Sequence, residues 1–314
     1  MNILISGFGQ MGCRHAQSLL TSNDDYSIHI IEPSDEAFET GLSTIGASKN
    51  DFTRYQKIEE LNASIDLAIS ATCSKPRYSI LLNLIEYGIK YFLLEKIVFQ
   101  SLEQFDIIIE KLKSNGAVAY SHFPRRYYKN FTELKSIIRK SNSPISINVY
   151  GGNNGIGCNA IHFMDLFEFL TGSNICKSSS CLKEDKDYDR RGPDYTDVNG
   201  LLVLENYNKD QLSIYFDPTF RAGVTEIIEN SDEKYIFSTR DKKEYQFIND
   251  NIDQKEFEVL YTSELTKILV KDILEGNTKL PTVEETRNAH SYLFKMIMFA
   301  LGKKLNSKTL CPIT

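Results

Sequence analysis

Residues 1–12 are Met1-Asn2-Ile3-Leu4-Ile5-Ser6-Gly7-Phe8-Gly9-Gln10-Met11-Gly12, a short apolar run followed by three closely spaced glycines. Residues 2–6 form a short apolar run with the length of a buried parallel strand. Residues 10–20 follow with a helix-compatible pattern, and the glycines between the two segments are spaced as GxGxxG. A strand, a glycine turn and a helix form a phosphate cradle, because the helix N-terminus offers N–H groups and partial positive charge to an anion.

The three glycines of this turn have separate tasks. Gly7 permits the tight turn, Gly9 lets the backbone approach a pyrophosphate, and Gly12 lets helix and strand pack closely. A second apolar run, Tyr26–Ile31, is followed by Glu32, which can accept hydrogen bonds from an adenosine ribose. The alternative is a tight turn that binds nothing, and the combined pattern favours the dinucleotide site.

Glu32 also bears on which dinucleotide binds. A carboxylate there would repel the 2′-phosphate of NADP, and residues 33–41 contain no arginine or lysine. The sequence therefore favours NAD over NADP.

Composition excludes several classes of protein. The chain has 314 residues and a net charge of −6, and it contains no concentrated basic run, so we do not expect nucleic acid as a partner. No apolar stretch has the length of a membrane span, and the first strand begins without a charged leader. We therefore expect a cytoplasmic protein that does not bind membranes.

The first part of the chain alternates strands and helices, which predicts a doubly wound parallel sheet of the Rossmann type. The expected strands are residues 2–6, 26–31, 52–55, 66–71, 91–94 and 117–121, and the expected helices are 10–20, 34–40, 76–87 and 102–114. Ligands of such sheets lie beyond the C-terminal ends of the strands. The polar or turn residues near these ends are Gly7, Glu32, Thr72, Lys96 and His122.

The pattern changes after about residue 145, where strands follow one another without helices between them. The expected strands are residues 146–150, 200–205, 211–216, 225–228, 235–238 and 244–248, and the expected helices are 127–139, 158–170, 256–274 and 283–301. This pattern predicts an α+β domain with an open, mostly antiparallel sheet. We expect a dinucleotide-binding domain at residues 1–122 and a second domain at residues 123–314, whose terminal helix can pack back on the first.

Lys96 is the first candidate for chemistry. It follows a strand of the nucleotide domain, where a lysine can reach nicotinamide and substrate together. Partial desolvation would lower its pKa toward the range useful for proton transfer. The alternative is an ordinary surface lysine at the end of a strand.

His162 is the second candidate, on the expected helix 158–170. Asp165 and Asn159 are each three residues away and share its helix face. A histidine held by a carboxylate is a suitable general acid or base, whereas the alternative is a core histidine that is hydrogen-bonded to a nearby acceptor. Cys158, His162 and Asp165 could also bind a metal, but no fourth ligand is evident, so no metal site is predicted.

Arg125, Arg126 and Tyr127 form a compact basic and aromatic cluster after the last parallel strand. Such a cluster could bind a phosphate or carboxylate group of a substrate. The alternative, an ordinary surface at the start of a helix, has equal support from the sequence.

Together these positions resemble the glucose-fructose oxidoreductase/inositol dehydrogenase family (Gfo/Idh/MocA) over nearly the whole chain. The similar segments are the GxGxxG turn, Ala71–Ser74, Leu94–Ile97, Phe123–Tyr127, Gly157–Asp165 and Gly276–Pro281 with the helix after it. The resemblance implies a Rossmann domain, an open-sheet domain, and pyridine-nucleotide redox chemistry on a sugar, cyclitol or nucleotide sugar. It also implies a homo-oligomer, a dimer or tetramer, that assembles through the C-terminal sheet.

The resemblance also implies roles for particular residues. Lys96 and His162, with Asp165, would carry the proton chemistry. Nucleotide contacts would come from Gly7, Phe8, Gly9, Gln10, Met11, Gly12, Glu32, Thr72, Cys73 and Glu95. Substrate contacts would come from Arg126, Tyr127 and Asn159.

The chain departs from the family pattern at positions that matter for chemistry. Ile97 replaces a proline after Lys96, and Cys158 stands where many members have an aspartate four residues before the histidine. Cys73, Arg77 and Pro124 also differ from the usual residues. Without an aspartate at position 158, Asn159 or Asp165 would have to orient His162.

Three hypotheses for function follow. The first is an NAD-dependent dehydrogenase or reductase that acts on a sugar-type substrate, in surface polysaccharide synthesis for example. The second is a non-catalytic NAD(H)-binding sensor or interaction protein, which the changes at Ile97 and Cys158 motivate. The third is a reductase of a C=N or C=C bond on the same scaffold.

Overall fold

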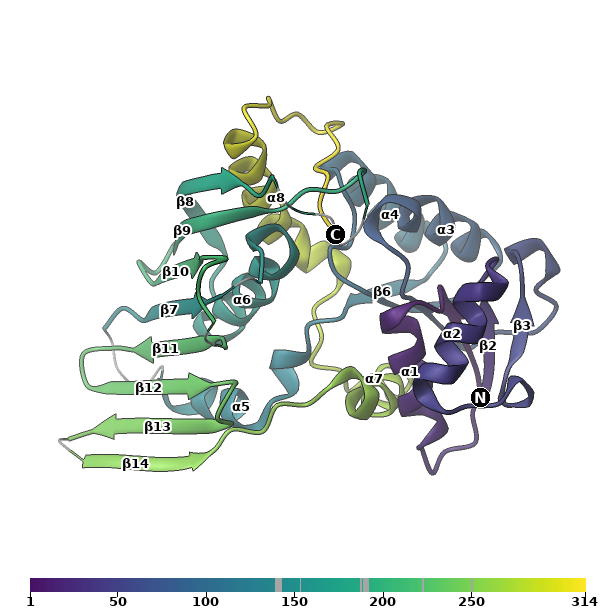
Figure 1. Ribbon diagram of the computed structural model, residues 1–314, viewed down its shortest axis with the longest axis horizontal. Coiled ribbons are helices and arrows are strands. Elements are labelled where there is room, and N and C mark those ends of the chain that lie inside the picture. The colour runs from purple at the N-terminus through teal and green to yellow at the C-terminus, as the bar shows by residue number, and fades with distance from the viewer. Residues whose placement is uncertain (139–142, 153, 187, 189–191, 222, 250) are drawn as a thin grey trace. The chain divides into compact units, whose positions relative to one another are not determined.

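A computed structural model of the chain describes residues 1–138, 143–152, 154–186, 188, 192–221, 223–249 and 251–314 (Figure 1). The chain divides into two compact units. Unit 1 comprises Met1–Phe99, Glu103–Pro124 and Leu260–Glu285, and unit 2 comprises Gln100–Leu102, Arg125–Val259 and Thr286–Thr314. Among the described residues, no helix combines the length and the apolar character needed to cross a membrane.

Unit 1 is built on a six-stranded parallel sheet in the order β3-β2-β1-β4-β5-β6, which confirms the doubly wound prediction. Its strands are β1 (Asn2–Ser6), β2 (Ser27–Ile31), β3 (Thr53–Tyr55), β4 (Leu67–Ser70), β5 (Tyr91–Leu94) and β6 (Val118–Ser121). Its helices are α1 (Gln10–Leu20), α2 (Asp35–Ile45), α3 (Ser74–Glu86), α4 (Leu102–Ser114) and α7 (Thr262–Glu275), with short 3-10 turns η1 (Lys49–Asp51) and η2 (Ile58–Glu60). The central strands β1, β4 and β5 are almost entirely buried, because helices cover both faces of a parallel sheet.

Helix α7 lies far from the rest of unit 1 in sequence, yet it packs on α1, where the backbone N–H of Lys267 donates to Ser18 Oγ at 3.0 Å. The expected helix 256–274 began too early, since α7 begins at Thr262. Glu264 explains this start, because its carboxylate accepts the backbone N–H of Tyr261 at 3.1 Å and so caps the first turn.

Unit 2 is built on an eight-stranded sheet in the order β14-β13-β12-β11-β7-β10-β9-β8, visible as a row of arrows in Figure 1. The strands are β7 (Ser146–Gly151), β8 (Ile175–Glu184), β9 (Val198–Asn206), β10 (Gln211–Phe216), β11 (Thr225–Glu229), β12 (Glu233–Ser238), β13 (Lys243–Ile248) and β14 (Asn251–Glu256). Only the β7–β10 pair is parallel among these described strands, so the prediction of an open, mostly antiparallel sheet is confirmed. The helices are α5 (Lys129–Ile137), α6 (Ile156–Thr171) and α8 (Val283–Ala300), with the 3-10 turn η3 (Pro124–Tyr127).

Strands β8 and β14 were not predicted, and they are the two edges of the sheet. All six residues of β14 are exposed, and β8 contains three consecutive serines. Because edge strands are solvated, their sequences lack the apolar pattern by which interior strands are recognised. The expected helix 127–139 is shorter, since α5 begins at Lys129, and Arg139 lies outside the described residues.

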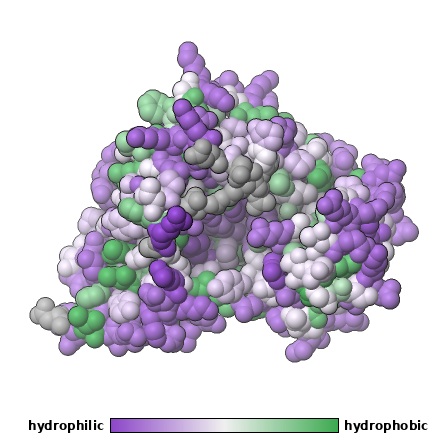
Figure 2. All heavy atoms as spheres, in the orientation of Figure 1, coloured by the Kyte–Doolittle hydropathy of each residue, from purple (hydrophilic) through white to green (hydrophobic). Residues whose placement is uncertain are grey.

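The helices of unit 2 pack on one face of its sheet. Phe131 of α5 contacts Phe237 of β12 with ring centroids 4.8 Å apart, and Phe163 of α6 contacts Phe216 of β10 at 5.9 Å. The alternate residues of β12, such as Ile236, point to the other face and are only half-buried. The surface visible in Figure 2 is mostly hydrophilic, with scattered apolar side chains.

Candidate active site

The glycine turn between β1 and α1 has the shape of a phosphate cradle. Gly7 has φ +88°, and a Cβ atom there would lie 2.9 Å from Thr72 Cγ2. A Cβ atom on Gly12 would lie 2.0 Å from the carbonyl oxygen of Gly7, whereas one on Gly9 would meet nothing within 4 Å. Protein atoms therefore close the turn at Gly7 and Gly12 and leave it open at Gly9, where α1 begins without a side-chain cap.

The other residues of the turn divide between core and surface. Phe8 is fully buried against Phe38 and Phe52, with ring centroids 5.4 and 5.6 Å away, so its side chain belongs to the core. Gln10 is exposed and Met11 is half-buried. A nucleotide contact by Phe8 would therefore have to come from its backbone.

Glu32 lies beside this turn with 9% of its surface exposed. One carboxylate oxygen accepts the backbone N–H of Phe8 at 2.9 Å, and the other accepts the N–H of Ser34 at 3.0 Å. Each carboxylate oxygen has a second lone pair, so the group can still accept a ribose hydroxyl. The structure thus places the Glu32 carboxylate beside the glycine turn, and its role in binding a ribose stays a prediction.

Arg54 is a cation beside Glu32 that lies outside residues 33–41, the segment in which the sequence contains no arginine or lysine. Its Nε and Nη2 atoms donate to the backbone oxygen of Glu32 at 3.0 and 2.9 Å, and Nη1 pairs with Asp35 at 2.7 Å. Arg54 comes from β3, which pairs with β2 in parallel. Nothing in the local sequence after Glu32 could have signalled it.

Arg77 joins the loops that carry Thr72, Cys73 and Lys96. This side chain is 1% exposed and donates to the backbone oxygens of Thr72 and Ile97, and to that of Val98 at 3.2 Å. Thr72 and Cys73 are half-buried, as is Lys96, and the Lys96–Ile97 peptide bond is cis. A buried cation therefore connects the C-terminal ends of β4 and β5.

Glu95 lies directly before Lys96, but its side chain points into the core, where it is 4% exposed. Its Oε1 atom lies 2.8 Å from His122 Nδ1 and 3.1 Å from His15 Nε2, and His15 Nδ1 lies 2.8 Å from Thr266 Oγ1. Although burial by itself would raise it, the pKa of Glu95 is held well below its usual range by His122 and His15. The sequence predicts His122 at a strand end, but no pattern in it singles out His15, which lies on the buried face of α1.

In unit 2, helix α6 carries His162, which is half-buried. Asp165 is 2% exposed and accepts two bonds from Arg126 Nε at 3.1 Å and one from Arg126 Nη2 at 2.8 Å. Asn159 donates to the backbone oxygen of Asn154. The structure thus joins two predicted site residues, Arg126 and Asp165, in one buried ion pair.

Arg125 forms a second ion pair with a buried carboxylate in unit 2. Its guanidinium lies 4.2 Å from the ring centroid of Phe163 and donates to Glu226 at 3.3 Å. Glu226 is fully buried, and burial raises its pKa, against the effect of Arg125. Tyr127 is half-buried at the end of η3. Both arginines of the predicted cluster are therefore anchored by buried carboxylates.

Asp197 caps the N-terminus of α6, because the N-cap residue of that helix, Gly155, has no side chain to do so. Its carboxylate accepts the backbone N–H groups of Gly157 at 2.6 Å and Cys158 at 3.3 Å, although it lies 40 and 39 residues away from them, respectively. A Cβ atom on Gly155 would lie 2.0 Å from this carboxylate. The helix that carries His162 is therefore anchored at its N-terminus by a distant acid.

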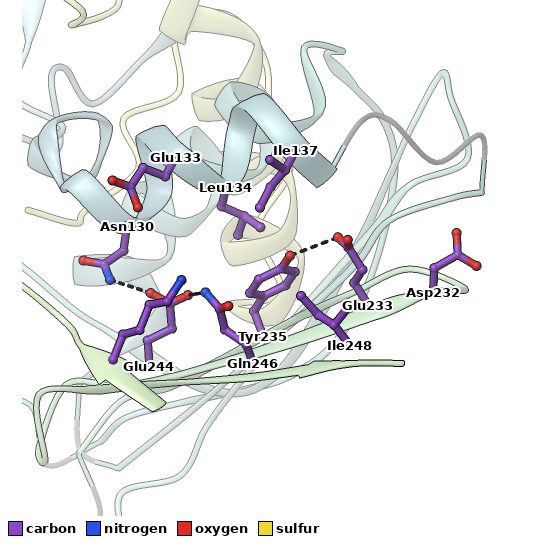
Figure 3. A pocket seen from close by; sticks show the side chains of 11 residues that line it. Asn130, Glu133, Leu134, Ile137, Asp232, Glu233, Tyr235, Glu244, Gln246 and Ile248 are labelled. Carbon is purple, nitrogen blue, oxygen red and sulfur yellow. Dashed lines mark hydrogen bonds between the residues drawn. The ribbon is translucent and has the colours of Figure 1, made fainter. Parts of the chain in front are cut away.

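A cavity of about 370 Å³ lies in unit 2 between α5 and the strands β12 to β14. Figure 3 shows Asn130 directed toward Glu244, and Tyr235 toward Glu233. No residue of the predicted site lines this cavity. We therefore do not assign this cavity to the active site.

Comparison with known proteins bears on the first 123 residues most directly. Residues 1–123 match the Gfo/Idh/MocA family model, described as an oxidoreductase family with an NAD-binding Rossmann fold, which confirms the family resemblance and the NAD prediction for this part. Myo-inositol 2-dehydrogenase of Thermotoga maritima is 25% identical over 138 residues, which are 44% of this chain. The aligned part spans 40% of that relative.

Several solved structures share the fold over almost the whole chain. An oxidoreductase from Agrobacterium radiobacter in complex with NAD+, L-tartaric acid and magnesium has a TM-score of 0.75 at 10% identity, covering 98% of each chain. UDP-N-acetylglucosamine 3-dehydrogenase from Acidithiobacillus ferrooxidans has a TM-score of 0.74 at 13% identity, covering 96% of this chain and 97% of that one. A super-repressor mutant of Gal80p from Saccharomyces cerevisiae has a TM-score of 0.76 at 14% identity, covering 98% and 97%.

Proposed function

From the match of residues 1–123 to the NAD-binding Rossmann fold of the Gfo/Idh/MocA family, we propose that the protein is an NAD-dependent dehydrogenase or reductase. It transfers a hydride between nicotinamide and a hydroxyl-bearing carbon of a sugar, cyclitol or nucleotide sugar. The observation that carries this proposal is the glycine turn, closed by protein atoms at Gly7 and Gly12 and open at Gly9 beside Glu32. The names of two relatives, an inositol dehydrogenase and a nucleotide-sugar dehydrogenase, support the substrate class.

In this proposal the chain's residues handle the proton. NAD, when bound, supplies the hydride acceptor. In the oxidative direction the substrate carbon loses a hydride, and Lys96 or His162 takes the hydroxyl proton, which leaves a carbonyl product. Asp165 is assigned to proton transfer together with Lys96 and His162. Its ion pair with Arg126 also supports a role in holding Arg126 in position to bind the substrate.

Substrate recognition is assigned to Arg126, Tyr127 and Asn159. Arg126 has only 16% of its side chain exposed and is already held by Asp165, so it presents a fixed rather than a mobile charge. A fixed guanidinium recognises a carboxylate or phosphate with little loss of side-chain entropy. This favours substrates that carry an anionic group, such as nucleotide sugars, in line with a role in polysaccharide synthesis.

A sugar panel tests the proposal. The protein is mixed with NAD or NADP and with sugars, cyclitols and nucleotide sugars, and the absorbance of the reduced nicotinamide is followed. We expect turnover with NAD and at least one member of the panel, and none with the Gly9→Val variant. Tight NAD binding without any turnover, in either direction, would contradict the proposal.

A non-catalytic role is the second candidate, and one observation favours it. A repressor, Gal80p, has this fold over 97% of its own chain. Under this alternative the protein binds NAD(H) and passes the signal to a partner protein. A C=N or C=C reductase is a further alternative, which imine or enone substrates added to the same panel would detect.

We also propose that a second copy of the chain covers the open face of the sheet in unit 2. Ile227, Ile236 and Tyr245 stand in register across β11, β12 and β13 on the face turned away from α5. All three are only partly buried. An apolar row of this kind on a regular sheet face favours self-association into a dimer or tetramer.

The cytoplasm is the proposed location of the protein.

A further inference from the structure

Four side chains from four elements of unit 1 meet at Glu95. His15 comes from α1, Glu95 from the end of β5, His122 from the end of β6, and Thr266 from α7. The imidazole rings of His15 and His122 lie 5.2 Å apart at an angle of 61°. His15 and Thr266 are fully buried, and the other two are at most 4% exposed. The proposed reaction does not use this cluster directly.

The hydrogen bonds of the cluster place a proton on each imidazole nitrogen that faces Glu95. Both imidazoles direct one nitrogen to the same oxygen, Glu95 Oε1, at 2.8 and 3.1 Å. An ionised carboxylate can only accept, so each facing nitrogen carries a proton. His15 therefore donates through Nε2, and its Nδ1 atom bonds to Thr266 Oγ1.

His122 donates to Glu95 through Nδ1. Among the described residues its Nε2 atom is buried without a hydrogen-bond partner. A protonated Nε2 would be a buried donor with no acceptor, which is costly, so the neutral Nδ1–H tautomer fits this position. The cluster is thus one buried carboxylate held by two imidazole N–H donors.

This arrangement fixes the chain at the point where Lys96 leaves the sheet. The side chain of Glu95 is held from two sides, and its backbone N–H donates to Ser70 at 3.0 Å. On the far side of Lys96, the buried Arg77 binds the backbone oxygens of Ile97 and Val98. Lys96 therefore stands between two anchored neighbours.

We infer that His15 and His122 are positioning residues for Lys96 that act through Glu95. The inference rests on the proposed function, because it takes Lys96 as a group of the proton transfer. Neither histidine touches the substrate or the cofactor in this scheme. They hold the residue next to Lys96, and a displacement of about 1 Å in a reacting group can cost on the order of a hundredfold in rate.

Amide side chains allow a matched test at each histidine. The Gln amide nitrogen replaces Nε2 of histidine, and the Asn amide nitrogen replaces Nδ1. His15→Gln and His122→Asn therefore keep the donor to Glu95, whereas His15→Asn and His122→Gln remove it. His29→Gln is the control, because His29 is a buried histidine of β2 that bonds to Tyr55 rather than to Glu95.

Two readouts are measured on each folded variant. The first is kcat, KM and NAD affinity with the substrate found in the panel. The second needs no activity: competitive acetylation followed by mass spectrometry gives the pH-dependent reactivity of Lys96. We expect the two donor-keeping variants and the control to stay within about twofold of the wild type. The donor-removing variants should lose about tenfold or more in kcat, with unchanged NAD affinity, and should alter Lys96 reactivity.

The outcomes separate the inference from its alternatives. Equal loss in both variants at one histidine would indicate a merely structural role and overturn the inference. Loss confined to NAD affinity, or a stoichiometric divalent metal found by elemental analysis of the purified protein, would also overturn it. If His15→Asn does not fold, the His122 pair decides alone. If the wild type turns over no substrate, the proposed function fails, and Lys96 acetylation still tests the positioning.

Discussion

At the scale of single residues, Glu32 combines two tasks. Its carboxylate accepts the N–H groups of Phe8 and Ser34, and in the proposed dinucleotide site it would also accept a ribose hydroxyl. Arg54 lies against the backbone of the same residue but is paired with Asp35. The Nε, Nη1 and Nη2 atoms of Arg54 each already donate to Glu32 or Asp35. We therefore propose that the charge of Glu32 sets the preference against a 2′-phosphate.

We expect Glu32→Gln to narrow the preference for NAD over NADP by about fivefold, because two unit charges 4 Å apart repel by about 1 kcal/mol in water. The amide removes the charge and keeps one of the two oxygens that accept backbone N–H groups. Fluorescence titration with both reduced cofactors measures the change, with Glu36→Gln, an exposed acid of α2, as control. Tighter binding of NADPH by the wild type would show that Glu32 does not set the preference.

Glu168 gives a pH-dependent prediction. Burial raises its pKa to about 7, so the folded protein keeps a proton that the unfolded chain loses near pH 4.5. The protonated Glu168 side chain makes its full contribution to the free energy of unfolding below pH 4.5. This contribution, up to about 3 kcal/mol, is lost as the pH rises through about 7.

Glu168→Gln should therefore reduce the fall in unfolding free energy between pH 5 and pH 8, a range that follows from the raised pKa. Urea unfolding at several pH values measures it, and Glu133→Gln, at an exposed position of α5, is the matched control. An unchanged pH profile in Glu168→Gln would exclude this residue as the source.

At the scale of elements, the glycines of the β1–α1 turn differ in what surrounds them. Gly12 is closed by the backbone of Gly7, whereas the space beside Gly9 holds no protein atom within 4 Å. We therefore expect Gly12 to matter for packing and Gly9 for nucleotide binding.

Substitutions in this turn should therefore have opposite effects. Gly9→Val should fold with a melting temperature near that of the wild type and lose NAD binding, because its side chain occupies the pyrophosphate path. Gly12→Ala should lose about 1–3 kcal/mol or more of stability through overpacking. Thermal melts and cofactor titration measure the two effects. Normal NAD binding by folded Gly9→Val would mean that the cradle is assigned to the wrong place.

At the scale of the whole molecule, each unit contributes one candidate for proton transfer, Lys96 in unit 1 and His162 in unit 2. If His162 is the general acid or base, His162→Ala should lower kcat by about 10²–10⁴ and leave NAD affinity unchanged. Lys96→Ala should lower kcat as well, and the double variant should lose less than the product of the two losses, since groups that act as a unit are not additive. Full turnover in both single variants would remove both residues from the mechanism.

The open sheet face supplies a second prediction at this scale. Ile236→Lys should shift the protein toward the monomer, because a charge in the apolar row disfavours its burial against a second copy. Sedimentation velocity measures the change, with Phe299→Lys as control, since Phe299 is an exposed apolar residue of α8. A wild type that is monomeric at all concentrations would contradict the proposal.

Features that depend on a local pattern of residues could be predicted from the sequence. Periodicity and turn residues located the parallel strands and helices of unit 1 and the interior strands of unit 2, since buried elements must be apolar on their covered faces. The glycine turn with Glu32 was found in the same way, because the pattern requires fixed spacing along the chain. Edge strands β8 and β14 escaped, since solvated strands need no apolar pattern.

The contacts between polar groups from distant elements could not be predicted from the sequence and are seen in the folded structure alone. Arg54 reaches Glu32 from β3, Asp197 caps α6 from about 40 residues away, and His15 joins Glu95 and His122 across three elements. None of these pairs has a characteristic spacing in sequence. Buried polar groups must find partners to offset their desolvation, but any element that the fold brings close can supply the partner.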